Sequence, residues 1–295
     1  MNTCPGLMTG TLRVTDEPDT AMLKALQVSA TQHRQLVELE RQKQLREITA
    51  THAARRASHP NPLARYGRQV YSQSDEDGIT LEILRRIGLN TGCFAEFGVG
   101  DGTENNSLVL LALGWRGLWI GVQDLAYVPP QDGRLTFRQD WVTADNVVTL
   151  GTPHDCGLSD LDVVSVDLDG NDLYFCKALL DAGARPSLFI CEYNAKFPPP
   201  IRFSIEYDPA HEWQNDDYVG TSLQSLIDLF AKFDYALVCC NAATGVNAFF
   251  VRKDQMKKFT DVPETASEIY ADPFYQLIPN MGHPRSVRTI LNLIK

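Results

Sequence analysis

Short apolar runs alternate with amphipathic stretches over most of the chain from residue 61 onward. We predict that the apolar runs are strands, at residues 93–98, 118–122, 135–139, 162–167, 188–192, 236–240 and 248–252. The stretches around and between them predict helices over residues 75–87, 105–114, 145–150, 172–182 and 222–233. Ser74 stands at the position where it would cap the first of these helices.

This alternation is typical of a mainly parallel sheet that carries helices on both faces. The expected fold class is therefore α/β, with a Rossmann-like, seven-stranded, mostly parallel sheet. The turn at residues 241–247 joins the last two apolar runs and predicts an antiparallel hairpin at the edge of the sheet. The last strand should consequently run against the others.

The N-terminal quarter has a different pattern. Residues 1–18 are rich in Thr, Pro, Gly and Asp without periodicity, which predicts a loose tail. Residues 19–58 contain no Gly or Pro, and their leucines recur at irregular steps among polar residues, which predicts one long helix or two. Pro60-Asn61-Pro62 ends this helical extension (residues 19–60), so the main domain is expected at 61–295. The broken apolar stripe fits a helix that lies on the main domain as well as it fits a homo-oligomer seam.

Composition and charge narrow the class of protein. With 295 residues, of which 44% are hydrophobic, the chain can bury a sizeable core. Its formal net charge of -10 argues against a nucleic-acid partner, because such proteins normally present a basic surface. The most apolar stretch, residues 108–122, contains Arg116 and three glycines and is too short for a membrane span. The opening residues lack a secretory pattern, and seven cysteines without a C-x-x-C pair fit reduced thiols, so a cytoplasmic location is expected.

The most informative segment is FAEFGVGDGT at residues 94–103. It is an apolar strand that carries an acid and then three alternating glycines before a helix. Such a turn lets backbone N–H groups approach an anionic or nucleotide-like ligand closely. A dinucleotide fingerprint would need a glycine at position 103, where this chain has Thr103, and that argues against a nicotinamide cofactor.

The acid and glycines resemble motif I of class I S-adenosylmethionine-dependent methyltransferases. Three further segments look like those of the FkbM-like family within that class: YSQSDEDG at residues 71–78, GWRGLWI at 114–120 and VDLDG at 166–170. The resemblance implies a methyltransferase that uses S-adenosyl-L-methionine, with O-methylation of a sugar or another small-molecule hydroxyl as the expected reaction.

The same resemblance implies which residues bind the cofactor. At the end of the second strand, where an acid usually binds the ribose, the sequence reads Gln123-Asp124, so either residue is a candidate. Asp140 follows the third strand and is expected near the adenine amine, although a lone aspartate there is also typical of a turn cap. The predicted cofactor-binding residues are Gln73, Glu96, Gly98, Gly100, Asp101, Gly102, Gln123 and Asp140.

A second group of polar residues follows the fourth and fifth strands. Asp167 and Asp169 lie two apart, as do Glu192 and Asn194, so all four are expected at the carboxyl edge of the sheet, where ligands bind. We predict that they are catalytic, with Asp167, Glu192 and Asn194 as ligands of Mg²⁺ or another divalent cation, since hard oxygen donors suit such ions. Without a metal, these side chains would cap the following elements, act as a general base or bind substrate directly.

Residues 207–218 are dense in polar and aromatic side chains, which predicts a loop that faces the substrate, with Trp213 and Tyr218 stacking on a sugar. Two other classes of function stay open. The first is a nucleotide-sugar-dependent glycosyltransferase in which Asp167 and Asp169 form a metal-binding D-x-D pair. The second is a non-catalytic assembly protein with a methyltransferase-like fold, in which residues 19–58 mediate oligomerisation.

Overall fold

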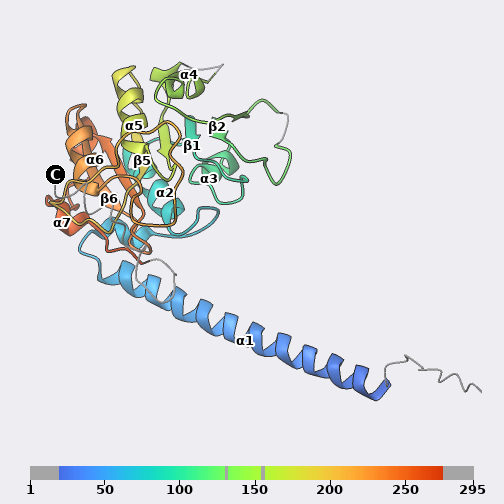
Figure 1. Ribbon diagram of the computed structural model, residues 1–295. Helices are drawn as coiled ribbons and strands as arrows, with labels where there is room; N and C mark the ends of the chain where they lie inside the picture. Colours follow the sequence, from blue (N-terminus) through green and yellow to red (C-terminus); the bar gives the residue numbers. More distant parts are fainter. Residues whose placement is uncertain (1–19, 130–131, 154–156, 275–295) are drawn as a thin grey trace, which may run out of the picture. The chain divides into compact units, whose positions relative to one another are not determined.

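The computed structural model describes residues 20–129, 132–153 and 157–274, and it divides into two units between Ala50 and Thr51 (Figure 1). The predicted tail at residues 1–18 lies outside the described residues. Helix α1 (Thr20–Ser58) is a single helix, as one of the two alternatives predicted. Its last turns belong to the larger unit, where Arg55 Nε donates a hydrogen bond to the Ala242 carbonyl at 2.8 Å. The structure therefore divides about ten residues, nearly three helical turns, before the predicted boundary at Pro60.

The larger unit is built on one seven-stranded sheet with the order β3-β2-β1-β4-β5-β7-β6. Six strands run in one direction, and β7 runs against them, because it pairs antiparallel with both β5 and β6. The predicted reversed strand and hairpin are therefore confirmed. β7 lies inside the sheet, and β6 forms the edge. The strands are β1 (Cys93–Phe97), β2 (Arg116–Gly121), β3 (Leu135–Gln139), β4 (Val163–Val166), β5 (Leu188–Glu192), β6 (Tyr235–Cys240) and β7 (Asn247–Arg252).

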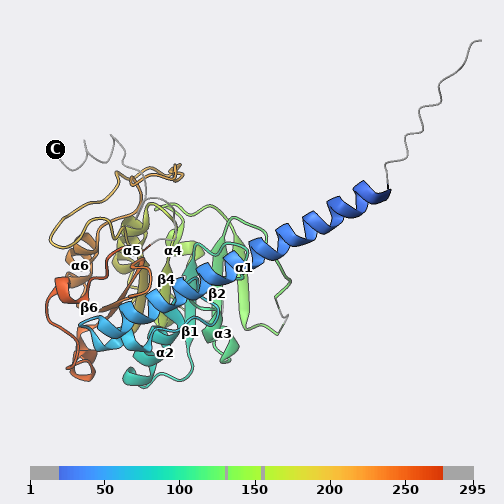
Figure 2. The same ribbon diagram turned by 90° about the horizontal axis from the view of Figure 1, so that it is seen from below.

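Helices cover both faces of this sheet. In Figure 2, α4, α5 and α6 lie on one side of the strands and α2 and α3 on the other. The helices are α2 (Glu76–Ile87), α3 (Leu108–Ala112), α4 (Val147–Leu150), α5 (Asp172–Asp181), α6 (Leu223–Ala231) and α7 (Ala266–Ile269), with short 3-10 turns at Pro62–Tyr66, Leu158–Asp160 and Lys253–Lys258. The central strands β1 and β4 are buried at every position, as expected for a sheet covered on both faces.

Two local predictions are wrong at helix starts. α2 begins at Glu76 rather than at residue 75, and Ser74 does not cap it, because its hydroxyl donates to the Glu76 carboxylate at 2.9 Å. α3 begins at Leu108 rather than at residue 105, because the preceding residues form a turn that a side chain from β1 holds. No helix in the described part of the chain is both long and apolar enough to cross a membrane. The five cysteines that the structure describes are buried free thiols.

The order of strands reverses between β1 and β4, which are neighbours in the sheet although β2 and β3 lie between them in the sequence. In open α/β sheets, the crevice at such a switch point, beyond the carboxyl ends of the strands, is where ligands bind. Gly98 follows β1 and Asp167 follows β4, so the predicted site residues flank this crevice.

Candidate functional site

The glycine turn after β1 forms one wall of the crevice. Gly98 has φ +93°, and a Cβ placed on it would lie 1.5 Å from the Asp167 carbonyl oxygen, so no other residue fits there. Gly100 differs, because its φ is ordinary and the nearest atom to a Cβ would be Gln123 Oε1 at 4.0 Å. The first glycine thus allows two backbone segments to meet, and the second leaves the backbone open to the crevice.

Glu96, the acid of the motif, is 4% exposed and is engaged within the protein. Its carboxylate accepts hydrogen bonds from the backbone N–H groups of Asn106 at 2.8 Å and Ser107 at 3.0 Å, and from the Ser107 hydroxyl. Trp119 Nε1 in turn donates to that hydroxyl at 2.9 Å. Burial raises the pKa of Glu96, which these hydrogen bonds partly oppose. The main role of Glu96 is therefore structural, because its carboxylate fixes the backbone turn just before α3.

Two connected cavities occupy the crevice. The larger, of about 510 Å³, extends toward the hairpin, and Gln73, Glu96, Gly98, Gly100, Asp101, Gly102 and Gln123 from the predicted cofactor-binding set line it. The smaller, of about 350 Å³, extends toward β3 and is lined by Asp140 together with apolar and aromatic side chains, namely Val99, Trp141, Val142, Leu168, Phe175 and Trp213. The cavities share Gly98, Gly100, Gln123, Asp167 and Asp169. Every predicted cofactor-binding residue thus lines at least one of them.

Of the two residues after β2 that were candidates for binding the ribose, only one faces the crevice. Gln123 lines both cavities, whereas Asp124 lines neither and accepts a hydrogen bond from Gln139 at 3.1 Å. Asp140 accepts from the N–H of Trp141 at 2.8 Å, so it also caps its own turn. The Trp141 indole donates to the Pro209 carbonyl at 2.7 Å, which fixes the loop that follows β5 beside the smaller cavity.

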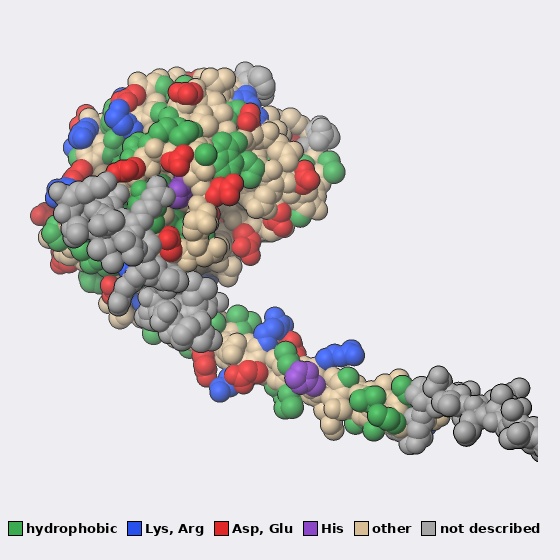
Figure 3. Space-filling view, in the orientation of Figure 1, with side chains coloured by type: hydrophobic (Ala, Val, Ile, Leu, Met, Phe, Trp, Pro, Cys, Tyr) green, Lys and Arg blue, Asp and Glu red, His purple; other side chains and the backbone are tan. Residues whose placement is uncertain are grey.

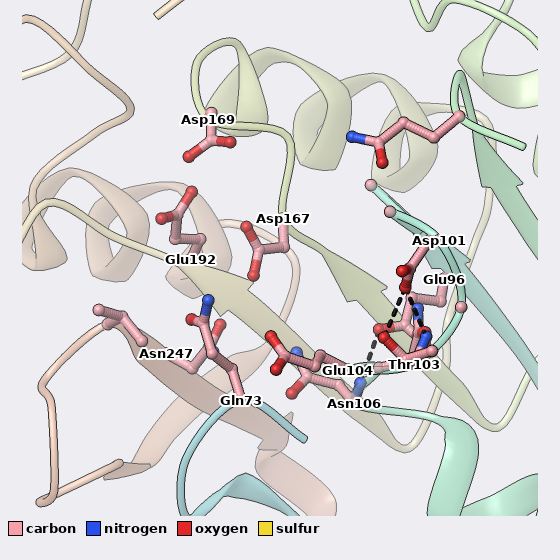
Figure 4. Close-up of a pocket in the computed structure, with 16 residues that line it drawn as sticks. Gln73, Glu96, Asp101, Thr103, Glu104, Asn106, Asp167, Asp169, Glu192 and Asn247 are labelled. Carbon is pink, nitrogen blue, oxygen red and sulfur yellow. Dashed lines mark hydrogen bonds between the residues drawn. The ribbon is translucent and has the colours of Figure 1, made fainter. Parts of the chain in front are cut away.

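Three predicted catalytic side chains, Asp167, Asp169 and Glu192, come together at the ends of β4 and β5 (Figure 4). One carboxylate oxygen of each lies within 4.8 Å of the others. Burial and then the nearby charge of Asp169 raise the pKa of Asp167 well above its usual range. Burial and then the charge of Asp167 do the same to Glu192. Glu192 Oε2 is buried and has no hydrogen-bond partner among the described residues, so the cluster offers an unused acceptor.

Asp172 at the start of α5 holds the turn that carries Asp169, a role that the sequence analysis did not assign. Its carboxylate accepts from the N–H groups of Leu168 at 2.8 Å and Gly170 at 2.9 Å, which holds the turn between β4 and α5. Asp169 has φ +53° in that turn. An aspartate in the first turn of a helix was the available signal, since it satisfies backbone donors there.

Asn194 lines a small hollow together with Asp169 and Glu192, while its side-chain hydrogen bonds go to the loop after β5, so its part as a metal ligand stays a prediction. Its amide nitrogen donates to the carbonyls of Asp217 and Val219, both at 3.1 Å, and its oxygen accepts from the N–H of Lys196 at 3.2 Å. The side chain therefore ties the loop after β5 to residues 217–219. Tyr218 is also not available for stacking, because it is 4% exposed and packs with Phe197, Phe203 and Ile205. Trp213, in contrast, lines the smaller cavity, so its stacking on a sugar stays a prediction.

Acidic side chains dominate the surroundings of the crevice. In the space-filling view they are spread over the middle of the visible face of the larger unit, and its basic side chains lie mainly toward the margin (Figure 3). No lysine or arginine is among the residues that line either cavity in the described part of the chain. The electrostatic field in the crevice therefore favours a ligand that carries positive charge.

No family model matches the chain, and no curated protein matches it either. Among solved structures, it is similar to the methyltransferase MycE from the mycinamycin biosynthetic pathway, in complex with Mg, SAH and mycinamycin VI, with 17% identity and a TM-score of 0.38. That match covers 62% of this chain and half (50%) of MycE. The methyltransferase domain of bacterial CtHen1-C matches at 13% identity and a TM-score of 0.37, over 60% of this chain and 97% of its own. The glycopeptide N-methyltransferase MtfA matches at 13% and 0.32, over 61% and 91%.

Proposed function

We propose that this chain is an S-adenosylmethionine-dependent methyltransferase that methylates a hydroxyl of a saccharide or another small molecule. The observation that carries the proposal is the glycine turn at the switch point of the sheet. Gly98 has no room for a side chain, and Gly100 faces open space in a cavity that both neighbouring strands line. Such an approach of bare backbone to the crevice is how doubly wound folds hold nucleotide-like cofactors.

The two cavities suit the two halves of this cofactor. The smaller one combines the apolar side chains of Val99, Val142 and Leu168 with the polar groups of Gln123 and Asp140, which fits an adenosine. The larger one is polar and extends from the glycine turn to Glu192, which fits the methionine part and the reacting groups. The sulfur would then lie where the cavities meet, beside Gly98 and Asp167.

Once bound, the cofactor supplies a methyl group on a sulfonium that is already a good leaving group. The residues of this chain then have to align the acceptor and take its proton. Glu192 suits the second task, because its buried carboxylate has a raised pKa and an oxygen without a partner. A carboxylate tuned upward in this way is a better base near neutral pH than an exposed one.

The side chains near Glu192 support a saccharide as the acceptor. Asp169 and Trp213 line both the smaller cavity and a hollow of about 20 Å³ beside Glu192, which has room for a single hydroxyl group. Carboxylates accept hydrogen bonds from sugar hydroxyls, and an indole offers an apolar face to the ring. This set matches a ligand that presents several hydroxyls around a compact apolar body.

A divalent cation fits the same cluster. Asp167, Asp169 and Glu192 would hold it, since hard carboxylate oxygens suit Mg²⁺ or Ca²⁺ and the cation would relieve their mutual repulsion. When bound, such an ion would lower the pKa of an acceptor hydroxyl. If this holds, methyl transfer falls on EDTA treatment and returns with Mg²⁺ or Ca²⁺, and metal analysis finds one ion per chain. Full activity in EDTA would leave Glu192 as the base on its own.

Calorimetric titration with S-adenosylhomocysteine tests the cofactor assignment. The wild type should bind with one site, and Gly100→Val should lose measurable binding, because its side chain would fill the space above the turn. The thermal unfolding of Gly100→Val should stay near that of the wild type, since the nearest atom to the new Cβ would be the end of the Gln123 side chain at 4.0 Å. Equal affinity in both proteins would refute the assignment. Stabilisation by a UDP-sugar and not by S-adenosylhomocysteine would favour the glycosyltransferase instead.

A further inference from the structure

The larger cavity is rich in carboxyl groups, which accept hydrogen bonds and can carry negative charge. Six carboxylates line it, those of Glu96, Asp101, Glu104, Asp167, Asp169 and Glu192. No lysine or arginine is among the described residues that line the cavity. Burial raises the pKa of Glu96, Asp167 and Glu192, and a cation bound beside these three groups would favour their charged form. Carboxylate clusters are common on surfaces, so the orientation of the neutral side chains beside them is the more specific observation.

Asn247 at the start of β7 lines this cavity. It is 3% exposed, and its Nδ2 donates to Glu76 Oε1 at 3.3 Å. Glu76 is held in place by the backbone N–H of Ser74 at 2.9 Å and by Asn241 Nδ2 at 2.9 Å. Because the nitrogen has to face a carboxylate, the oxygen is directed away from it, and that oxygen has no partner among the described residues. Figure 4 shows Asn247 beside Gln73 on the wall below Glu192.

Asn105 repeats this arrangement on the opposite wall. It is 3% exposed, its side chain donates a hydrogen bond to Glu96, and its Oδ1 is buried without a partner among the described residues. Two buried carboxylates, Glu76 and Glu96, therefore each orient an asparagine that lines the same cavity and has a buried oxygen without a partner among the described residues. A buried oxygen without a donor costs free energy, so a ligand that brings donors or positive charge would recover it.

We infer that the cavity selects its cofactor in the cationic form, so that it binds S-adenosylmethionine more tightly than S-adenosylhomocysteine. The inference rests on the proposed function. During transfer, the methyl group leaves for the acceptor, the electron pair of its bond stays on sulfur, and the acceptor loses a proton. The sulfonium thereby becomes a neutral thioether, and its attraction to Asp167, Asp169 and Glu192 ends. The acidic cluster would therefore favour release of the product as well as binding of the substrate.

The size of the preference follows from the charges. At an effective dielectric constant of about 20, a unit charge several Å from a carboxylate is worth about tenfold or more in affinity. The test compares three probes by calorimetry in the presence of EDTA, so that the carboxylates meet only the probe. These are S-adenosylmethionine, S-adenosylhomocysteine and sinefungin, which carries an ammonium group where the sulfonium stands. The first and third should bind at least about tenfold more tightly than the second.

Asp169→Asn is the informative variant, because asparagine tolerates the positive φ of this position. It should weaken both cationic probes and leave S-adenosylhomocysteine unchanged, so that the preference shrinks. Asp181→Asn is the matched control, since it removes the same charge from an exposed ion pair with Lys177 at the far end of α5. Asn247→Ala should weaken all three probes alike, because all three carry the α-ammonium group of the amino-acid end.

The outcomes separate the two proposals. If none of the probes binds the wild type, the proposed cofactor is wrong. If all bind but S-adenosylhomocysteine binds as tightly as the cationic probes, the proposed function survives and the charge selection is overturned. An Asn247→Ala variant with unchanged affinity for every probe would likewise overturn the part assigned to the asparagine oxygens.

Discussion

Replacing Glu96 by glutamine isolates the contribution of one buried carboxylate to the site. The wild-type carboxylate accepts from two backbone N–H groups, at 2.8 and 3.0 Å, and from the Ser107 hydroxyl. In Glu96→Gln, one acceptor oxygen becomes an NH₂ group, which faces the N–H and hydroxyl of Ser107 and leaves a buried donor without a partner. That loss costs about 1–3 kcal/mol, and more when the acceptor was charged.

Two opposing effects set the expected magnitude. Burial raises the pKa of Glu96, which means that ionisation of the wild-type side chain already costs free energy that the neutral glutamine does not. We therefore expect a loss of about 2 kcal/mol near neutral pH rather than the upper end of the range. Because the folded-state pKa is raised, the carboxyl stabilises the fold most below its usual value of 4.5 and progressively less as pH rises. The difference between wild type and variant should thus be larger in mild acid than at neutral pH.

Urea unfolding followed by far-UV circular dichroism measures this difference. The midpoint should fall while the dependence on urea stays the same, since the surface exposed on unfolding is unchanged. Glu104→Gln is the control, because Glu104 lines the same cavity but is exposed. Affinity for S-adenosylhomocysteine should also fall in Glu96→Gln, since the turn before α3 would shift. A variant as stable as the wild type at both pH values would refute the view that Glu96 holds this turn.

Two further predictions concern the larger unit. Burial raises the pKa of Asp75 and of Asp172 to about 6, so the protein without ligand should lose stability as pH rises from about 4 through 6, by an amount on the order of 2 kcal/mol for each group. Asp75→Asn should flatten the pH dependence of the urea midpoint over that interval, and an unchanged slope would contradict the assignment. A chain that begins at Thr51 should fold and bind S-adenosylhomocysteine as the full chain does, whereas one that begins at Asn61 should be less stable, because it lacks the hydrogen bond from Arg55 to Ala242. Equal melting temperatures for the two truncated chains would show that the end of α1 contributes nothing.

The arrangement of the sheet was predictable because the apolar runs are strongly periodic. β3 and β5 have the bounds that the sequence predicts, and the positions of Glu96, Asp167 and Glu192 at strand ends follow from those bounds. The start of α3 was not predictable in the same way. Its first turn is displaced by Glu96, which lies about ten residues earlier, and local helix signals carry no information about a hydrogen bond over that distance.

The positions of Asn194 and Asn247 both follow from the topology of the sheet. The spacing of residues 192 and 194 along β5 predicts one face, but the chain leaves the strand at Glu192, and Asn194 turns to the loop at residues 217–219. The sequence predicts the hairpin, but it does not predict which of the two hairpin strands pairs with β5. Because β7 inserts between β5 and β6, Asn247 lies directly opposite Glu192 in the register.

That register gives the charge of the cavity a structural origin. Opposite residues of an antiparallel pair have their Cβ atoms about 5 Å apart, so Asn247 and Glu192 present two acceptors to one ligand. Glu76 accepts a hydrogen bond from Asn247 Nδ2 at 3.3 Å, which directs the amide oxygen away from Glu76. Glu76, the buried first residue of α2 and about twenty residues before the glycine turn, thereby helps to keep the crevice selective for positive charge.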